Sequence, residues 1–141
     1  MKIEKPDKNS YNRLIEIWES AVKATHDFLS AEYFEYIKSR LPLYFEHVAL
    51  YSYTDDNVIK GFLGVSESAI EMLFIDDKYR GSGIGKSLLK FAVEDLKLSR
   101  VDVNEQNTRA VGFYKHFGFK ETGRSEHDSE GRNYPIIHLQ I

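Results

Sequence analysis

One stretch of the chain combines an apolar strand, a glycine-rich turn and the start of a helix. The apolar run Met72-Leu73-Phe74-Ile75 comes shortly before the turn, and the residues from Ile84 to Leu96 have helical spacing. The turn itself reads Arg80-Gly81-Ser82-Gly83-Ile84-Gly85-Lys86. Backbone N–H groups at a helix start are unpaired and attract anions, and glycine lets a phosphate approach the backbone closely. This stretch therefore predicts that the chain holds a phosphorylated cofactor.

Three phosphate-binding patterns compete for this turn. A nucleotide-hydrolase loop, G-x-x-x-x-G-K-[ST], would end in Gly85-Lys86-Ser87, but its first glycine position is Arg80. A dinucleotide fingerprint, G-x-G-x-x-G, matches Gly81 and Gly83, but its third glycine position is Lys86. The pattern R-G-x-G-x-G is filled at every defining position. It resembles the acyl-CoA pyrophosphate loop of the GNAT N-acetyltransferases.

A second motif follows the turn after one helix and one strand. It has the form N-x-x-A-x-x-x-Y-x-x-x-G-F, with Asn107, Ala110, Tyr114, Gly118 and Phe119 at its defined positions. Two motifs in this order resemble the GNAT superfamily, most clearly over residues 59–141. The resemblance implies an acetyl-CoA-dependent N-acetyltransferase that works by direct attack in a ternary complex. A non-catalytic acyl-CoA sensor on the same fold is the alternative.

The resemblance also implies cofactor-binding residues. The pyrophosphate would bind at residues 80–86, and Asn107 would contact the pantetheine arm. Backbone groups of Leu73, Phe74 and Ile75 would pair with the pantetheine amides, and an N–H near Leu73 or Phe74 would stabilise the oxyanion. Arg80 and Lys86 add positive charge around the turn.

Transfer to an amine needs a proton donor for the leaving thiolate and a route for the proton of the amine. By position in the motif, Tyr114 is the expected general acid. The base stays open between Glu71, Asp102 and a water chain that needs neither side chain. The resemblance also implies an acceptor pocket near the end of the first helix, and three residues would line it: His26, Trp18 and Phe28.

Composition limits the cofactors and partners that the chain can be expected to have. The chain has 141 residues, no cysteine, five histidines without metal-ligand spacing, and a net charge of −3. We expect one N-acetyltransferase domain over residues 1–141, in the cytoplasm, with no metal and no nucleic-acid or membrane partner. The acceptor could be a small-molecule amine or an amine of a peptide or protein, and the protein a monomer or homodimer.

Periodicity and turn residues predict the order βααβββαβαββ, which makes an α/β three-layer sandwich with helices on both faces of a mixed, twisted sheet. Helices are expected over 9–25, 30–40, 84–97 and 107–117, the second ending before Pro42. Strands are expected over 2–4, 46–54, 58–67, 69–76, 100–104, 119–127 and 133–140. A hairpin turn is expected at Thr54-Asp55-Asp56-Asn57, and another turn at Ser129-Glu130-Gly131.

Overall fold

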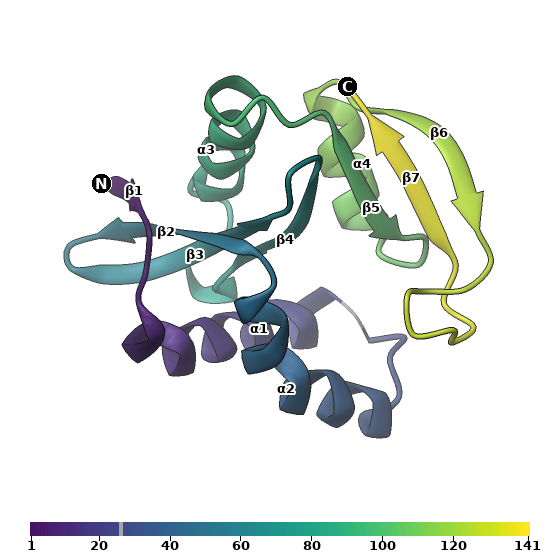
Figure 1. Ribbon diagram of the computed structural model, residues 1–141, viewed down its shortest axis with the longest axis horizontal. Coiled ribbons are helices and arrows are strands. Elements are labelled where there is room, and N and C mark those ends of the chain that lie inside the picture. The colour runs from purple at the N-terminus through teal and green to yellow at the C-terminus, as the bar shows by residue number, and fades with distance from the viewer. Residues whose placement is uncertain (26) are drawn as a thin grey trace. The chain divides into compact units, whose positions relative to one another are not determined.

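The computed structural model describes residues 1–25 and 27–141 (Figure 1). The chain forms two compact units, Met1–Leu98 and Ser99–Ile141, and each is described by itself. Along the chain, the helices and strands follow the predicted order βααβββαβαββ. The expectation of a single domain over residues 1–141 stays a prediction.

The first unit is an antiparallel sheet in the order β1-β2-β3-β4 with helices on both of its faces. Helices α1 and α2 pack on one face and α3 on the other (Figure 1). The strands are β1 (Lys2–Glu4), β2 (Ala49–Asp55), β3 (Val58–Val65) and β4 (Ala69–Ile75). The helices are α1 (Tyr11–Thr25), α2 (Ala31–Glu46) and α3 (Ile84–Lys90), which continues as the π-helical turn η3 (Phe91–Asp95).

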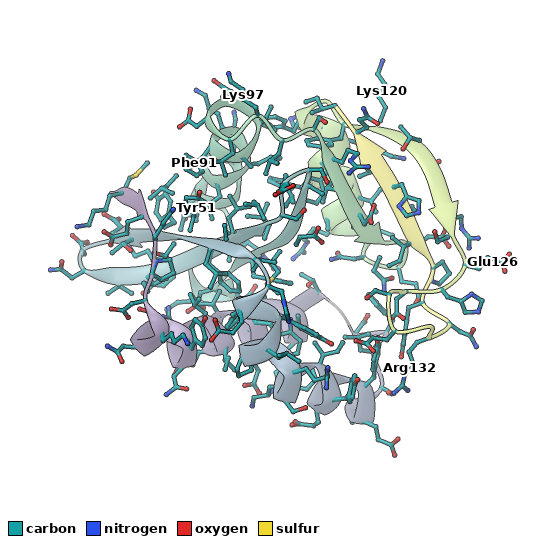
Figure 2. All side chains as sticks on the ribbon, in the orientation of Figure 1. Tyr51, Phe91, Lys97, Lys120, Glu126 and Arg132 are labelled. Atoms are coloured by element: carbon teal, nitrogen blue, oxygen red, sulfur yellow. The ribbon has the colours of Figure 1, made fainter. Side chains whose placement is uncertain are left out.

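Both faces of this sheet bury apolar side chains. On the α1 and α2 face, the ring of Phe62 from β3 meets the ring of Phe45 edge-on, with centroids 5.8 Å apart. The rest of that cluster comes from both helices: Leu14, Ile17, Trp18, Val22 and Leu41. Elsewhere in this unit, Tyr51 of β2 meets Phe91 of η3 at 5.1 Å (Figure 2). The apolar residues at helical spacing in α1 and α2 therefore form the buried faces of these two helices.

The hairpin between β2 and β3 confirms the predicted turn. Asp55 pairs with Val58, so the loop has two residues. Asp56 and Asn57 have φ angles of 52° and 60°, and both positive values are those of a type I′ turn. Asp and Asn tolerate this conformation better than other non-glycine residues, which explains why the local sequence was sufficient to predict it.

Helix α2 corrects one prediction. It does not end before Pro42 but runs from Ala31 to Glu46 with Pro42 inside it. The exposed Pro42 sits between Leu41 and Phe45, which are four residues apart and both buried. Proline inside a helix costs about 3 kcal/mol, whereas burial of the nearby Leu and Phe side chains stabilises the helix by about 1.5–3 kcal/mol each. As a result, β2 begins at Ala49 and not at residue 46.

The predicted helix over 84–97 is also shorter than expected. It is α-helical to Lys90 and π-helical to Asp95, where the Leu96 N–H donates to the Phe91 carbonyl. Lys97 has a φ of 60°, a left-handed conformation that ends the helical run. Burial of Leu98 directly after this residue explains why the chain turns there.

The second unit is a three-stranded antiparallel sheet in the order β5-β7-β6, with helix α4 packed on β5. Its elements are β5 (Arg100–Asn104), α4 (Thr108–Phe117), β6 (Lys120–Ser125) and β7 (Ile136–Gln140). The core of this unit consists of buried apolar side chains from its strands and helix: Val101, Val103, Tyr114, Phe119, Ile137 and Leu139. The predicted turn at 129–131 is present, with Gly131 at a φ of 75° and Asp128 accepting the N–H of Glu130 and of Arg132.

Within the described residues, none of the helices combines the length and apolar character needed to cross a membrane. The same part of the chain holds no group of three or more His, Cys, Asp and Glu residues placed to bind a metal ion.

Candidate functional site

The glycine turn after β4 has the backbone that its sequence predicts. Gly81 and Gly83 have φ angles of 84° and 86°, a region that residues with a Cβ rarely adopt. A Cβ built on either glycine would have no atom within 4 Å of it. Both glycines therefore face open space, and an anion can approach their backbone from that side.

Helix α3 starts directly at this turn. Gly83 is its N-cap, and the first bond of the helix runs from the Ser87 N–H to the Gly83 carbonyl at 3.0 Å. The N–H groups of Ile84, Gly85 and Lys86 precede that bond and have no partner in the helix. The N-terminal dipole favours an anion at this helix start, Lys86 lies in its first turn, and Arg80 before the turn pairs with Asp77 at 3.0 Å. The arrangement fits a pyrophosphate.

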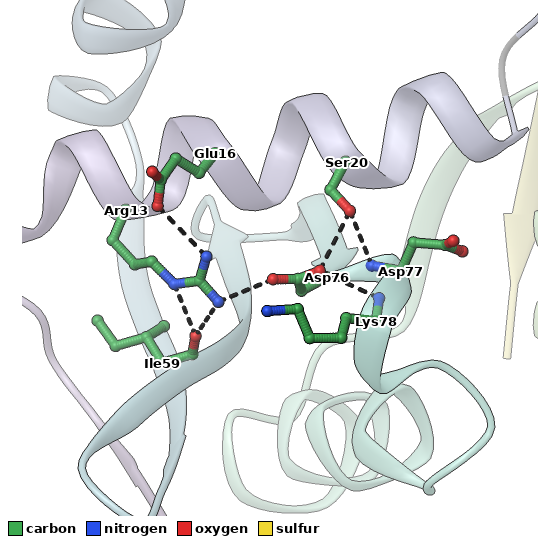
Figure 3. Close-up of polar contacts among 7 residues, drawn as sticks. All are labelled: Arg13, Glu16, Ser20, Ile59, Asp76, Asp77 and Lys78. Atoms are coloured by element: carbon green, nitrogen blue, oxygen red, sulfur yellow. Dashed lines mark hydrogen bonds and ion pairs between the residues drawn. The ribbon is translucent and has the colours of Figure 1, made fainter.

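A buried carboxylate holds the chain in place where it leaves β4 (Figure 3). Asp76 is only 6% exposed. Its Oδ2 accepts a bond from Arg13 Nη2 at 2.8 Å, and its Oδ1 accepts from the Ser20 hydroxyl at 3.2 Å and the Lys78 N–H at 3.1 Å. Ser20 Oγ in turn accepts the Asp77 N–H at 3.0 Å. Two side chains of α1 therefore fix the first residues of the segment that leads to the glycine turn.

Arg13 also connects the Asp76 carboxylate to strand β3. Its Nε and Nη2 donate to the Ile59 carbonyl at 3.0 and 2.8 Å. Burial by itself would raise the pKa of Asp76, but the hydrogen bonds from Arg13, the Lys78 N–H and Ser20 outweigh it, and the net pKa is lowered. Asp76 is therefore a carboxylate at neutral pH, and Arg13 compensates its charge.

We expect Asp76→Asn to reduce the free energy of unfolding by about 1–3 kcal/mol near neutral pH, because Arg13 loses a charged partner. A carboxyl whose pKa is lowered by folding stabilises the protein above its ordinary pKa of about 4, and loses that effect as the pH falls through the lowered value. Urea unfolding at several pH values measures this, and the difference from wild type should shrink in acid.

The matched control is Asp77→Asn. Asp77 is exposed and pairs only with the exposed Arg80 among the ion pairs of the described residues, so its loss should change stability by less than about 0.5 kcal/mol. An Asp76→Asn protein with wild-type stability at every pH would show that the network does not hold the loop.

Strand β4 carries the residues predicted to contact the pantetheine arm. Leu73 and Phe74 pair with Leu63 and Phe62 of β3, and Ile75 pairs with Gly61. A Cβ on Gly61 would lie 2.7 Å from Ile75 Cδ1 and 3.1 Å from Ile84 Cγ2, so glycine is required for this close packing. Within the first unit, β3 is the only described strand that pairs with β4.

The second unit positions Asn107 and Tyr114 on one short helix. Asn107 is the N-cap of α4, and its Oδ1 accepts the Ala110 N–H at 3.1 Å, as predicted. The helix ends in a Schellman motif, with the Phe119 N–H bonded to the Tyr114 carbonyl and the Gly118 N–H to that of Lys115. Gly118 has a φ of 131°. Both ends of the motif are therefore fixed by local hydrogen bonds.

Tyr114 lies in an apolar environment. Its ring contacts those of Phe113 and Phe119, at centroid distances of 5.3 and 5.6 Å. Burial raises the pKa of the Tyr114 phenol above its ordinary value. The hydroxyl is therefore protonated at neutral pH, as a proton donor has to be.

Of the other predicted site residues, Glu71 is exposed on β4 and Asp102 is exposed on β5. Trp18 is buried in the core of the first unit, with its ring 5.0 Å from that of Phe34. Phe28 is half-buried in the turn between α1 and α2, and His26 lies outside the described residues. Their roles in acceptor binding stay predictions.

Two features were missed from the sequence. The partners of Asp76 lie 63 and 56 residues away, at Arg13 and Ser20, and no spacing rule connects them. Asp102 contacts His138, a residue that no motif indicated. The only local signal was Asp76 itself, an acid directly before a short turn that its side chain caps.

Comparisons with known proteins point to one family and one fold. The model of the acetyltransferase (GNAT) domain matches residues 14–134. The chain is 43% identical to the peptidyl-lysine N-acetyltransferase YjaB of Salmonella typhimurium over 128 residues, which cover 90% of this chain and 88% of that protein. The solution structure of apo YjaB from Escherichia coli matches with a TM-score of 0.89 and 39% identity, covering 99% of this chain and 95% of that one.

A more distant structure shows the same fold. The PaiA N-acetyltransferase of Thermoplasma acidophilum, solved in complex with coenzyme A, matches with a TM-score of 0.77 at 22% identity. The match covers 99% of this chain and 98% of that one. These structural matches confirm the predicted fold class, an α/β sandwich with a mixed sheet and helices on both faces.

Proposed function

Since the chain belongs to the GNAT acetyltransferase family, we propose that it transfers an acetyl group from acetyl-CoA to the side-chain amine of a peptidyl lysine. The amine attacks the thioester directly while both substrates are bound. We also propose that residues 1–141 act as one domain, since the family model spans residues from both compact units.

The observation that carries acetyl-CoA binding is the glycine turn. Gly81 and Gly83 have positive φ angles, open space where a Cβ would be, and a helix start directly after them. Backbone N–H groups of this turn would bind the pyrophosphate, with Arg80 and Lys86 as nearby cations. The backbone of Leu73, Phe74 and Ile75 on β4 would bind the pantetheine amides.

The chemistry divides between backbone and side chains. An N–H near Leu73 or Phe74 would stabilise the oxyanion that forms when the amine nitrogen bonds to the acetyl carbon. The carbon–sulfur bond then breaks with its electron pair on sulfur, and the Tyr114 hydroxyl gives its proton to the thiolate. The buried, protonated phenol supports this role of Tyr114.

A lysine side chain is the acceptor that the relatives favour, because YjaB of Salmonella typhimurium is named a peptidyl-lysine N-acetyltransferase. The lysine amine has a pKa of about 10.4, so it must lose a proton before or during attack at neutral pH. A protein that catalyses this step needs a base or a water path at the acceptor side.

Coenzyme A release tests the proposal. We expect release with acetyl-CoA and a lysine-containing peptide, and none when norleucine replaces the lysine. Spermidine and free amino acids in the same assay would identify a small-molecule acceptor instead. If calorimetry shows acetyl-CoA binding but no amine supports release, the protein is an acyl-CoA sensor. If acetyl-CoA does not bind at all, the proposal is wrong.

A further inference from the structure

Ser20 of α1 contacts two successive residues of the segment that joins β4 to the glycine turn. Its hydroxyl donates to Asp76 Oδ1 at 3.2 Å, and its oxygen accepts the N–H of Asp77 at 3.0 Å (Figure 3). The helix, the segment and the glycine turn all belong to the first compact unit. Helix α1 therefore holds the backbone at the point where it leaves the sheet.

Asp77 connects this contact to the arginine of the glycine motif. Its carbonyl accepts the N–H of Arg80 at 3.2 Å, and its carboxylate pairs with the Arg80 guanidinium at 3.0 Å. These two interactions close the short helical turn η2 (Asp77–Tyr79). Because Ser20 fixes the N–H of Asp77 at the start of this turn, it also restricts the position of Arg80 at the end of it.

The same turn is connected to the residue that lies between the two glycines. The N–H of Tyr79 donates to the Asp76 carbonyl at 2.9 Å, and the Tyr79 carbonyl accepts the hydroxyl of Ser82. The ammonium group of Lys60 from β3 lies over the Tyr79 ring, 4.7 Å from its centroid. A continuous series of contacts therefore runs from α1 and β3 to Ser82, inside the glycine turn.

The other end of the glycine turn is fixed by burial. Ile84, the first residue of α3, is only 4% exposed, and its Cγ2 would lie 3.1 Å from a Cβ on Gly61. Between these two anchors, Gly81 and Gly83 face open space. Glycine has more conformational freedom than other residues, so a turn with unanchored ends would lose much of that freedom on binding an anion. Anchored ends reduce this loss before the ligand arrives, which increases affinity.

We propose that Ser20 is a positioning residue for the binding of acetyl-CoA. By holding Asp76 and Asp77, it keeps the N–H groups of the glycine turn and the Arg80 guanidinium in place for the pyrophosphate. This inference rests on the proposed function, because it needs the glycine turn to be the pyrophosphate site. Ser20 acts through residues 76–82 and takes no part in the proton transfers, so it sets the affinity for the cofactor and not the rate of the chemical step.

Ser20→Ala separates this role from folding. It removes both contacts with the segment but keeps the ion pair between Asp76 and Arg13 at 2.8 Å. Alanine is a better helix former than serine, so α1 itself should not be weakened. The matched control is Ser52→Ala. Ser52 is buried on β2, with β3 between it and β4, and its hydroxyl donates to the Glu4 carbonyl at 3.2 Å.

Calorimetry with coenzyme A and steady-state kinetics test the proposal together. We expect Ser20→Ala to weaken coenzyme A binding by about 5- to 10-fold, the scale of one net hydrogen bond, and Ser52→Ala to bind as wild type does. The KM for acetyl-CoA should rise by a similar factor with kcat unchanged, because the lost interaction affects ground state and transition state equally. With acetyl-pantetheine, which lacks the pyrophosphate, Ser20→Ala and wild type should have the same kcat/KM.

Hydrogen exchange of the unliganded protein provides a readout without activity. The N–H groups of Asp77 and Lys78 should exchange faster in Ser20→Ala, since the first loses its acceptor and the second bonds to the Asp76 carboxylate that Ser20 orients.

Three results would overturn this assignment. The first is wild-type affinity for coenzyme A in Ser20→Ala. The second is an equal loss of kcat/KM with acetyl-CoA and acetyl-pantetheine, and the third is an equal loss of affinity in Ser52→Ala, since either would mean a general effect on the fold. A wild-type protein that binds no coenzyme A would instead contradict the proposed function.

Discussion

Tyr114→Phe is expected to lower kcat by roughly 10²–10⁴-fold, the usual effect of losing one general acid. The substitution removes only the hydroxyl and keeps the ring contacts with Phe113 and Phe119. Thermal stability should therefore change little. Affinity for acetyl-CoA should fall modestly at most, because the hydroxyl would contact the cofactor only at its sulfur. Steady-state kinetics with the best amine of the release assay measures the effect.

Tyr53→Phe is the control for this variant, since Tyr53 is a half-buried tyrosine on β2 in the first unit. It should retain wild-type kcat. If Tyr114→Phe also keeps a near-wild-type kcat, Tyr114 only packs against its neighbours, and another group or water protonates the thiolate. A normal rate in both Tyr114→Phe and Tyr53→Phe would contradict only the role of Tyr114 as general acid. It would not contradict the acetyltransferase activity.

Gly83→Asp is expected to abolish detectable acetyl-CoA binding. The new side chain would enter the open space in front of the turn and place a negative charge where the pyrophosphate should bind. Gly83 has a φ of 86°, and Asp tolerates this conformation better than most residues. The fold should therefore survive, as circular dichroism can verify, while calorimetry reports the loss of binding.

Two variants separate charge from strain. Gly83→Asn imposes the same backbone strain and nearly the same volume without the charge, so it should keep part of the affinity. Gly112→Asp places the charge on α4, where a Cβ also meets nothing within 4 Å, and it should bind acetyl-CoA as wild type does. Unchanged affinity in Gly83→Asp would show that the pyrophosphate binds elsewhere.

Local features of this chain were predictable because their causes lie within a few residues. Asp56 and Asn57 form the hairpin turn through their own backbone preferences. Asn107 caps α4 through a neighbour three residues on, and Gly118 ends the helix through bonds to the turn before it. Pro42 shows the limit of such reasoning, because the packing of Leu41 and Phe45 outweighed the local effect of proline.

Sequence patterns alone were sufficient to predict the order of helices and strands, the glycine turn with its helix start, and the placing of Asn107 and Tyr114 on one short helix. Only the tertiary structure placed Arg13 on Asp76 and His138 between Asp102 and Ser125. Backbone conformation follows from steric and hydrogen-bonding preferences between near neighbours. A side-chain contact across 63 or 36 residues depends instead on strand register and helix packing, which only the folded chain defines.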